Sequence, residues 1–172
     1  MLTRVLIAIA ALVIPTSAFA LLYVQSPQQL YIFEAGTYSA TRVSQGKPLS
    51  VAKPKLIRAT TNISARLNVR FGLRYVVTGT DSSLTKLTMV TRYPGAGIRD
   101  HVSSELVSFS EYTIDVPVGR EIYRDFVFDD QSELVSGEWT FEFWADGRKL
   151  GEQTFCVSVP GEQPPVCAQL LG

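Results

Sequence analysis

The chain has 172 residues, of which 46% are hydrophobic, 10% aromatic and 19% charged. This composition fits one packed globular domain and excludes a disordered or low-complexity protein. The 16 basic and 16 acidic residues cancel to a formal net charge of zero, and the basic residues are dispersed rather than clustered with aromatic ones. Nucleic acid is therefore not among the expected partners.

The chain begins with the features of a cleavable secretory signal peptide. Arg4 supplies a positive charge, an apolar run follows over 5–14, and Ala18 and Ala20 form a small-x-small pattern. The run is well short of the ~20 residues that span a bilayer, and no cysteine follows it to take a lipid. We expect cleavage between Ala20 and Leu21, export to the periplasm or the medium, and no stable membrane insertion of the mature domain.

Charged residues are distributed unevenly along the chain. Residues 21–99 contain eleven Lys or Arg and two acids, whereas residues 100–172 contain four Lys or Arg and fourteen acids. This division predicts either a polarised surface or a sandwich in which strands of the two halves interleave and neutralise each other. We favour interleaving, because Greek-key topologies mix early and late strands.

The first half of the mature chain reads as short strands separated by turn residues. Strands are predicted over 31–41, 55–61, 69–78 and 84–93, with loops or turns over 43–54, 62–68, 79–83 and 94–97. Gly36, in the middle of the first strand, predicts a bulge or a bend. In the third strand Phe71 and Tyr75 alternate with Arg70 and Arg74, which predicts one apolar and one basic face.

The second half continues the pattern. Strands are predicted over 102–116, 121–128, 139–144 and 149–159, with turns over 117–119 and 129–132. Trp139, Phe141 and Phe143 alternate with polar residues and are expected in the core facing Phe155, whereas Trp144 falls on the opposite face. The dipeptide at 146–147 is Asp-Gly, which predicts a two-residue hairpin turn.

Seven or eight short strands with regularly spaced turns predict an all-β fold. An antiparallel β-sandwich is the favoured architecture, and a closed barrel is the main alternative. The expected organisation is a signal peptide over 1–20, a sandwich domain over 21–159 and a C-terminal tail over 160–172.

Cys156 and Cys167 are the only cysteines of the chain. In an oxidising compartment such a pair is expected to form a disulfide, here one that ties the tail to the last strand across a loop rich in Pro and Gly. A redox pair or a metal-binding pair is the alternative. The first is more often C-x-x-C, and the second needs more Cys or His than the chain has.

Three blocks of sequence resemble a family of bacterial exported domains that is catalogued only as a domain of unknown function. The blocks are Gly36-x-Tyr38, Phe71-Gly72-x-x-Tyr75, and Gly137-x-Trp139-x-Phe141 followed by Leu150 and Phe155. The chain departs from the family pattern at Ser64, where the family tends to Pro, and at Asn68, where it tends to Gly. The resemblance spans 33–159. It implies an immunoglobulin-like (Ig-like) antiparallel sandwich of about seven to eight strands and no activity, because none is assigned to the family.

Few residues suggest chemistry, and no catalytic, cofactor or metal site is expected. His101 beside Asp100 suggests a general base or a metal ligand, but one histidine cannot complete a metal site, and a solvated loop residue is the favoured interpretation. Asp129, Asp130 and Glu133 suggest a divalent cation, but the dense spacing of a calcium loop is absent and a turn is favoured.

Arg66, Arg70 and Arg74 recur every four residues and would form a basic row on one strand face. The row is the best candidate contact surface, for an anionic polysaccharide, lipid headgroups or an acidic protein partner. The alternative, which we favour, is an outer sheet face whose arginines pair with acids of the second half, such as Glu121 or Asp125.

The sequence therefore favours a non-catalytic binding or assembly module of the bacterial envelope, most simply a periplasmic one. The partner expected is an unknown protein or an anionic envelope ligand, and the oligomeric state stays open. A hydrolase that uses loop carboxylates around Asp100 or Asp129 is the alternative, and whether the chain is an enzyme is left undecided. A metal-handling protein is a third hypothesis, weakened by the single histidine.

Overall fold

A computed structural model describes residues 28–42, 51–79, 83–95, 97–100 and 103–167. These residues form two β-sheets, a small hairpin and one turn of 3₁₀ helix, η1. The elements are β1 (Gln29–Arg42), β2 (Val51–Ala59), β3 (Asn62–Ser64), β4 (Arg70–Thr78), β5 (Leu84–Arg92), β6 (Ile98–Arg99), β7 (Leu106–Val107), β8 (Phe109–Pro117), β9 (Glu121–Val127), η1 (Gln131–Glu133), β10 (Gly137–Ala145) and β11 (Arg148–Ser158).

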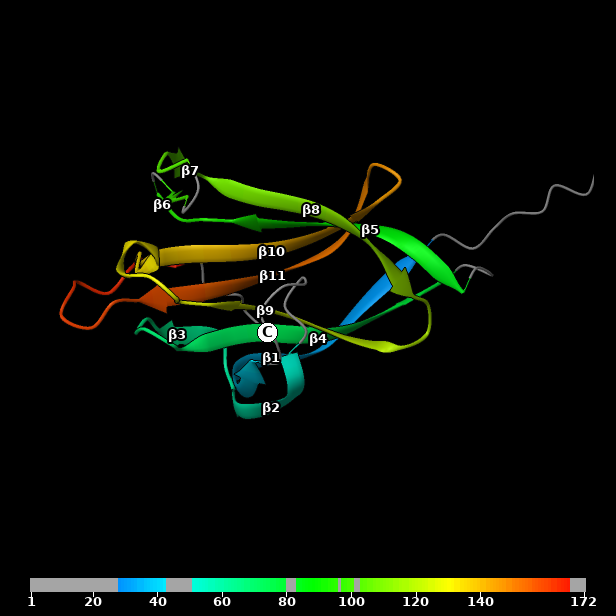
Figure 1. Ribbon diagram of the computed structural model, residues 1–172, viewed down its shortest axis with the longest axis horizontal. Coiled ribbons are helices and arrows are strands. Elements are labelled where there is room, and N and C mark those ends of the chain that lie inside the picture. Colours follow the sequence, from blue (N-terminus) through cyan, green and yellow to red (C-terminus); the bar gives the residue numbers. More distant parts are fainter. Residues whose placement is uncertain (1–27, 43–50, 80–82, 96, 101–102, 168–172) are drawn as a thin grey trace, which may run out of the picture.

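The two sheets make the sandwich. One sheet has the strand order β2-β1-β4-β9 and the other the order β3-β11-β10-β5-β8, while β6 pairs with β7. In Figure 1, β5, β8 and β10 lie in the upper part of the view and β1, β2 and β4 in the lower part. All neighbouring strands are antiparallel except β3 and β11, which are parallel. The predicted all-β sandwich is confirmed.

Aromatic rings from both sheets fill the core. Phe71 of β4 is fully buried and lies 5.7 Å from Phe141, 5.9 Å from Trp139 and 5.1 Å from Phe155, measured between ring centroids. Phe143 is buried as well and contacts Tyr75. The inward positions predicted from the alternation of β10 are confirmed, and the rings bury enough apolar surface to hold the two sheets together.

Each sheet combines strands of the basic and the acidic half. In one sheet β9 of the acidic half borders β4, and in the other β5 of the basic half lies between β10 and β8. Ion pairs join the halves at Arg70–Asp125, Arg74–Glu121, Lys86–Asp115 and Arg92–Glu142. The interleaving expected from the charge distribution is therefore present in the described residues.

Gly36 is a close-approach position rather than the bulge predicted for it. It pairs with Gly72 on β4 and with Ala59 on β2, and the register shifts of β1 lie on either side of it, between Ile32 and Glu34 and between Thr37 and Tyr38. A β-carbon on Gly36 would overlap the carbonyl oxygen of Arg58, and one on Gly72 would overlap that of Arg124. Glycine is needed here because neighbouring backbones come too close for a side chain.

Other boundaries differ from the predictions where pairing extends or interrupts a segment. Residues 62–64 form β3 instead of a turn, because they pair in parallel with β11. The predicted loop over 43–54 ends earlier, at β2, where Pro54 is tolerated on an edge strand; residues 43–50 lie outside the described part. The segment 102–116 is divided between β7 and β8, and the turn over 129–132 includes the start of η1.

The cysteines form the expected disulfide. Cys156 on β11 is bonded to Cys167, with Cα atoms 5.8 Å apart, so the tail is held against the last strand. The expected cleavage site, Ala20 and Leu21, lies outside the described residues. No helix in the described part is long and apolar enough to cross a membrane.

Candidate functional site

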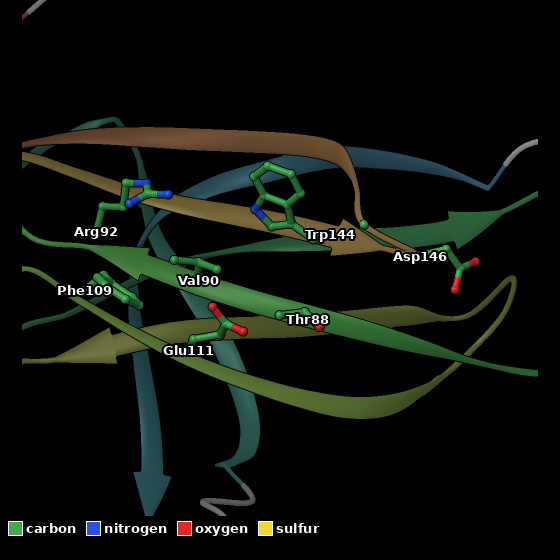
Figure 2. Close-up of a pocket in the computed structure, with 8 residues that line it drawn as sticks. Thr88, Val90, Arg92, Phe109, Glu111, Trp144 and Asp146 are labelled. Carbon is green, nitrogen blue, oxygen red and sulfur yellow. The ribbon is translucent and has the colours of Figure 1, made fainter.

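An open groove of about 470 Å³ lies on the outer face of the sheet that contains β5, β8 and β10. We call it the β5 groove, because β5 runs along its floor. It is lined by Thr88, Val90, Arg92, Phe109, Glu111, Trp144, Asp146 and Gly147. Figure 2 shows Arg92 and Phe109 at one end, Val90 and Glu111 in the middle, and Trp144 and Asp146 toward the other end.

The groove follows from the register of three antiparallel strands. Val90 lies between Glu111 of β8 and Glu142 of β10, and Thr88 pairs with Trp144 in the next outer row. Outward side chains that are directly opposite stand on the same face of a sheet. Small side chains on β5 between longer ones on β8 and β10 therefore leave a trough along the strand.

Glu142 anchors one side of the groove. Its side chain is 6% exposed and accepts hydrogen bonds from Arg92 Nε at 2.8 Å, Lys149 Nζ at 3.0 Å and Trp144 Nε1 at 3.0 Å. Burial raises the pKa of this carboxyl, but the hydrogen bonds from Arg92, Lys149 and Trp144 outweigh burial and bring the pKa down to about 2. The carboxylate is thus ionised at physiological pH and fixes three long side chains.

The hydrogen bonds to Glu142 hold the aromatic wall in place. The Lys149 ammonium lies 5.6 Å from the centroid of the Trp144 ring, and the Arg92 guanidinium lies 6.0 Å from that of Phe109. A cation at such distances is attracted to the ring face. Trp144 is therefore a rigid, half-buried ring beside groups that can donate and accept hydrogen bonds.

A tight hairpin turn closes one end of the groove. Ala145 pairs with Arg148 across the two turn residues, Asp146 with φ 49° and Gly147 with φ 73°. Two positive φ values match a type I′ turn, which the Asp-Gly dipeptide predicted. Among the described residues, neither Asp146 nor Glu111 makes an ion pair, so two uncompensated carboxylates border the groove.

A family model described as a domain of unknown function, DUF3859, matches residues 25–157. The chain belongs to this family. No curated protein matches the chain.

Among solved structures, the DUF3859 chain is similar to an immunoglobulin-like protein from Pseudomonas aeruginosa, whose crystal structure was determined at 1.50 Å resolution. The two are 23% identical with a TM-score of 0.59, and the match covers 78% of this chain and 99% of that chain. At this identity the likeness shows the fold alone, which is an Ig-like sandwich.

The three arginines predicted as a contact row do not lie together on one strand of the DUF3859 domain. Arg66 is exposed in the connection after β3, outside β4. Arg70 is 8% exposed and bonded to Asp125, and Arg74 is bonded to Glu121. For Arg70 and Arg74 the favoured interpretation, cross-strand pairing with acids of the second half, describes the geometry.

Arg70 also borders a second hollow, of about 450 Å³, on the outer face of the other sheet. It is lined by Tyr38, Ser39, Ile57, Asn68, Arg70, Val127 and Asp129. The guanidinium of Arg70 is taken by Asp125, and the Tyr38 hydroxyl donates to Glu34 at 2.9 Å. With these groups engaged, the second hollow offers fewer directed contacts than the β5 groove.

The loop carboxylates stabilise the turns in which they lie by accepting hydrogen bonds from nearby backbone N–H groups. Asp100 accepts from the backbone N–H of Ser103 at 2.7 Å, and Asp130 caps η1 by accepting from the N–H of Ser132 at 2.8 Å. Glu133 is buried and accepts from the N–H of Asp129 at 2.6 Å. Among the described residues, no three His, Cys, Asp or Glu side chains converge as metal ligands. His101 lies outside the described residues.

Sequence reasoning missed the β5 groove. It placed Trp144 and Glu142 on the outer face, but it did not bring Arg92 to them, because Arg92 is 50 residues away along the chain. The signal that could have pointed to the groove is Trp144, an aromatic residue on the otherwise polar face of β10. Only the pairing of β5 with β10 shows which residues it meets.

Proposed function

We propose that this chain is an exported, non-catalytic binding module that holds a neutral oligosaccharide in the β5 groove. The observation that carries the proposal is the fixed Trp144 ring, which stands in an open groove beside hydrogen-bonding groups that Glu142 holds in place. A pyranose ring has an apolar C–H face and a hydroxylated edge. An aromatic side chain with a few fixed polar groups is complementary to both.

The charge of the groove supports a neutral ligand rather than the anionic one considered for the arginine row. The positive charge of Arg92 is compensated by Glu142, while Glu111 and Asp146 lack ion-pair partners among the described residues. Like charges would therefore repel a polyanion at the groove. An open-ended trough along a strand also suits a linear chain of several sugar units.

Tryptophan fluorescence tests the proposal directly. The chain has two tryptophans, and Trp139 is fully buried in the core, so a ligand-induced change reports on Trp144. We expect saturable changes with cellotetraose or with the tetramer of N-acetylglucosamine, and none with a tetramer of galacturonic acid. Weak affinity in the range of about 0.1–1 mM is expected for a shallow, solvent-exposed site.

Two variants separate binding from folding. Trp144→Ala should abolish binding when it is followed by calorimetry, because the ring is lost, while the buried Trp139 still reports a folded core. Ile57→Ala, an exposed residue on the other sheet, is the matched control and should bind normally. If neither neutral tetramer binds the wild-type domain, the saccharide proposal is wrong.

The hydrolase alternative is tested in the same samples. We expect both tetramers to remain intact after prolonged incubation with the domain, as judged by chromatography. Release of shorter sugars would contradict a non-catalytic role and favour the loop carboxylates around Asp100 or Asp129. Sequencing the N-terminus of the protein recovered from the periplasm should give Leu21 as its first residue if the leader is cleaved as expected.

A further inference from the structure

β8 is an open edge of the sandwich. Within the described part of the chain it pairs only with β5, and it stands at the end of the order β3-β11-β10-β5-β8. All nine of its residues pair with β5 without a register shift. In Figure 1 it runs along the upper side of the molecule. A long, regular edge strand presents a row of backbone groups to any chain that can pair with it.

The direction of these backbone groups follows from the two ends of the β5–β8 ladder. Tyr93 N donates to Ser108 O at 2.9 Å before β8, and Val118 N donates to Ser83 O at 3.0 Å after it. In an antiparallel pair such bonded positions recur at every second residue. The even-numbered residues of β8 therefore bond to β5. The N–H and C=O groups of the odd-numbered residues from Phe109 to Asp115 point out of the sheet.

β8 is also the least protected of the four edges. Phe109, Tyr112 and Ile114 expose 48%, 39% and 38% of their surface. By contrast, β3 has three residues, β2 contains Pro54, and on β9 both Glu121 and Asp125 are held in ion pairs. Proteins usually guard a sheet edge with prolines, charged side chains, bulges or short strands. β8 is long and has no bulge, its one proline is its last residue, and its remaining guards are the carboxylates of Glu111 and Asp115.

The side chains of β8 define the chemistry of a partner strand. Its outer face carries Glu111, which has no ion-pair partner among the described residues, and Asp115, whose exposed pair with Lys86 measures 3.4 Å. Its inner face presents Tyr112 and Ile114, with the Arg124 guanidinium 5.2 Å from the Tyr112 ring centroid. A complementary strand therefore alternates basic residues on the outer face with apolar residues on the inner one.

A second copy of this chain is a poor occupant of the edge. Two β8 strands related by a two-fold axis would place the Glu111 and Asp115 carboxylates of both copies on one face of a continuous sheet. Like charges on neighbouring strands are destabilising. The acids thus disfavour self-pairing while they favour a basic strand from a different protein.

We propose that β8 is a strand-addition site for an extended polypeptide segment in which basic and apolar residues alternate. Backbone hydrogen bonds to Glu111, Thr113 and Asp115 supply affinity, and the alternating side chains supply selectivity. The site shares Glu111 with the rim of the β5 groove, but it differs from the saccharide proposal in its main determinant, which is the open backbone of β8 rather than the ring of Trp144.

The probe is a capped nine-residue peptide of alternating Lys and Val, compared with a peptide of alternating Glu and Val. Binding is followed by ¹⁵N–¹H NMR of the full mature domain. We expect the Lys peptide to shift the amide signals of Glu111, Thr113 and Asp115 and to slow their hydrogen exchange. The Glu peptide should bind at least about tenfold more weakly.

Thr113→Pro is the decisive variant. It removes an N–H that points away from β5, so the ladder inside the sheet is kept, as proline on an edge strand allows. We expect this variant to stay folded by near-ultraviolet circular dichroism and to lose peptide binding. Glu111→Lys, which keeps every backbone group, should weaken the Lys peptide about tenfold and provides the test if Thr113→Pro does not fold.

Three outcomes would overturn the proposal. These are equal binding of the Lys and Glu peptides, unchanged binding to a folded Thr113→Pro variant, and protection of the odd-numbered β8 amides by self-association alone. Trp144→Ala should bind the Lys peptide like wild type. A domain that binds no saccharide can therefore still bind the Lys peptide, and a domain that binds no peptide can still bind a saccharide.

Discussion

Glu142 orders the long side chains on the outer face of its sheet. It is surrounded by Arg92, Lys149 and Trp144, and the Lys149 ammonium also reaches Glu152 at 2.5 Å. The hydrogen bond and charge of Glu142 raise the pKa of Arg92, so both groups stay ionised. A buried charge is tolerated when its hydrogen-bonding capacity is filled, and here one carboxylate orders an aromatic ring and two cations.

Glu142→Gln tests this role through pH. The folded-state pKa of Glu142, about 2, lies below its ordinary value of 4.5, so its stabilising contribution is present above pH 4.5 and is lost as pH falls toward 2. We expect the variant to be less stable than wild type by about 1–3 kcal/mol at pH 7, with the difference shrinking toward zero near pH 2. Urea denaturation at a series of pH values measures it.

The matched control for this experiment is Glu111→Gln. Glu111 is an exposed residue on the same face of the sheet and makes no ion pair among the described residues, and its substitution should change stability by less than about 0.5 kcal/mol at pH 7. A difference for Glu142→Gln that stayed constant from pH 7 to pH 2 would show that its charge does not stabilise the fold.

Single residues were predicted well where one strand is enough to place them. Alternation put Trp139, Phe141 and Phe143 inside and Trp144 outside, and the compartment argument paired the two cysteines. Partners across strands could not be predicted, because a register depends on loop geometry and on which strands meet. Arg70 and Arg74 illustrate this: their spacing put them on one face, and only the position of β9 shows which acids they contact.

At the scale of elements, β11 is joined to the rest of the fold at three places. It pairs with β10 on one side and with β3 on the other, and it carries the disulfide to the tail. Its short partner β3 was expected to be a turn, because three residues show no periodicity. Pairing with a neighbour more than 90 residues away made it a strand.

Substitution of both cysteines, as Cys156→Ser with Cys167→Ser, tests the element directly. The bridge closes a short loop, with the cysteines 11 residues apart in sequence, so its removal should cost about 2–3 kcal/mol of stability. Thermal unfolding followed by circular dichroism should show a lower melting temperature with native spectra at 25 °C. A reducing agent should lower the melting temperature of the wild type by the same amount and leave the melting temperature of the variant unchanged. An unaltered melting temperature in the variant would show that the tail adds nothing to β11.

At the scale of the whole molecule, the core joins both sheets into one cooperative unit. Phe71 from one sheet contacts Trp139, Phe141 and Phe155 from the other. Phe71→Ala should lower the free energy of unfolding by about 3–5 kcal/mol, because it leaves a cavity at the centre of the ring cluster. Trp139 fluorescence and circular dichroism should still report one transition. Two separate transitions would show that the sheets unfold independently.

The fold class was predictable from the whole chain because regular turn spacing and alternation persist from one end of the domain to the other. The interleaving of the charged halves was also foreseen, from the known mixing of early and late strands in sandwiches. The β5 groove was not, because its lining residues come from three strands that are distant in sequence and carry no shared motif.

The strand order has a consequence for synthesis. β11, the last of the described strands, lies between β10 and the early strand β3, and the later strand β9 is the neighbour of β4. A chain emerging from the ribosome therefore holds most of its basic strands before the acidic strands that complete either sheet exist. The aromatic core cannot close before β10 and β11 have been made, because Phe71 of β4 packs against Trp139, Phe141 and Phe155 of those two strands.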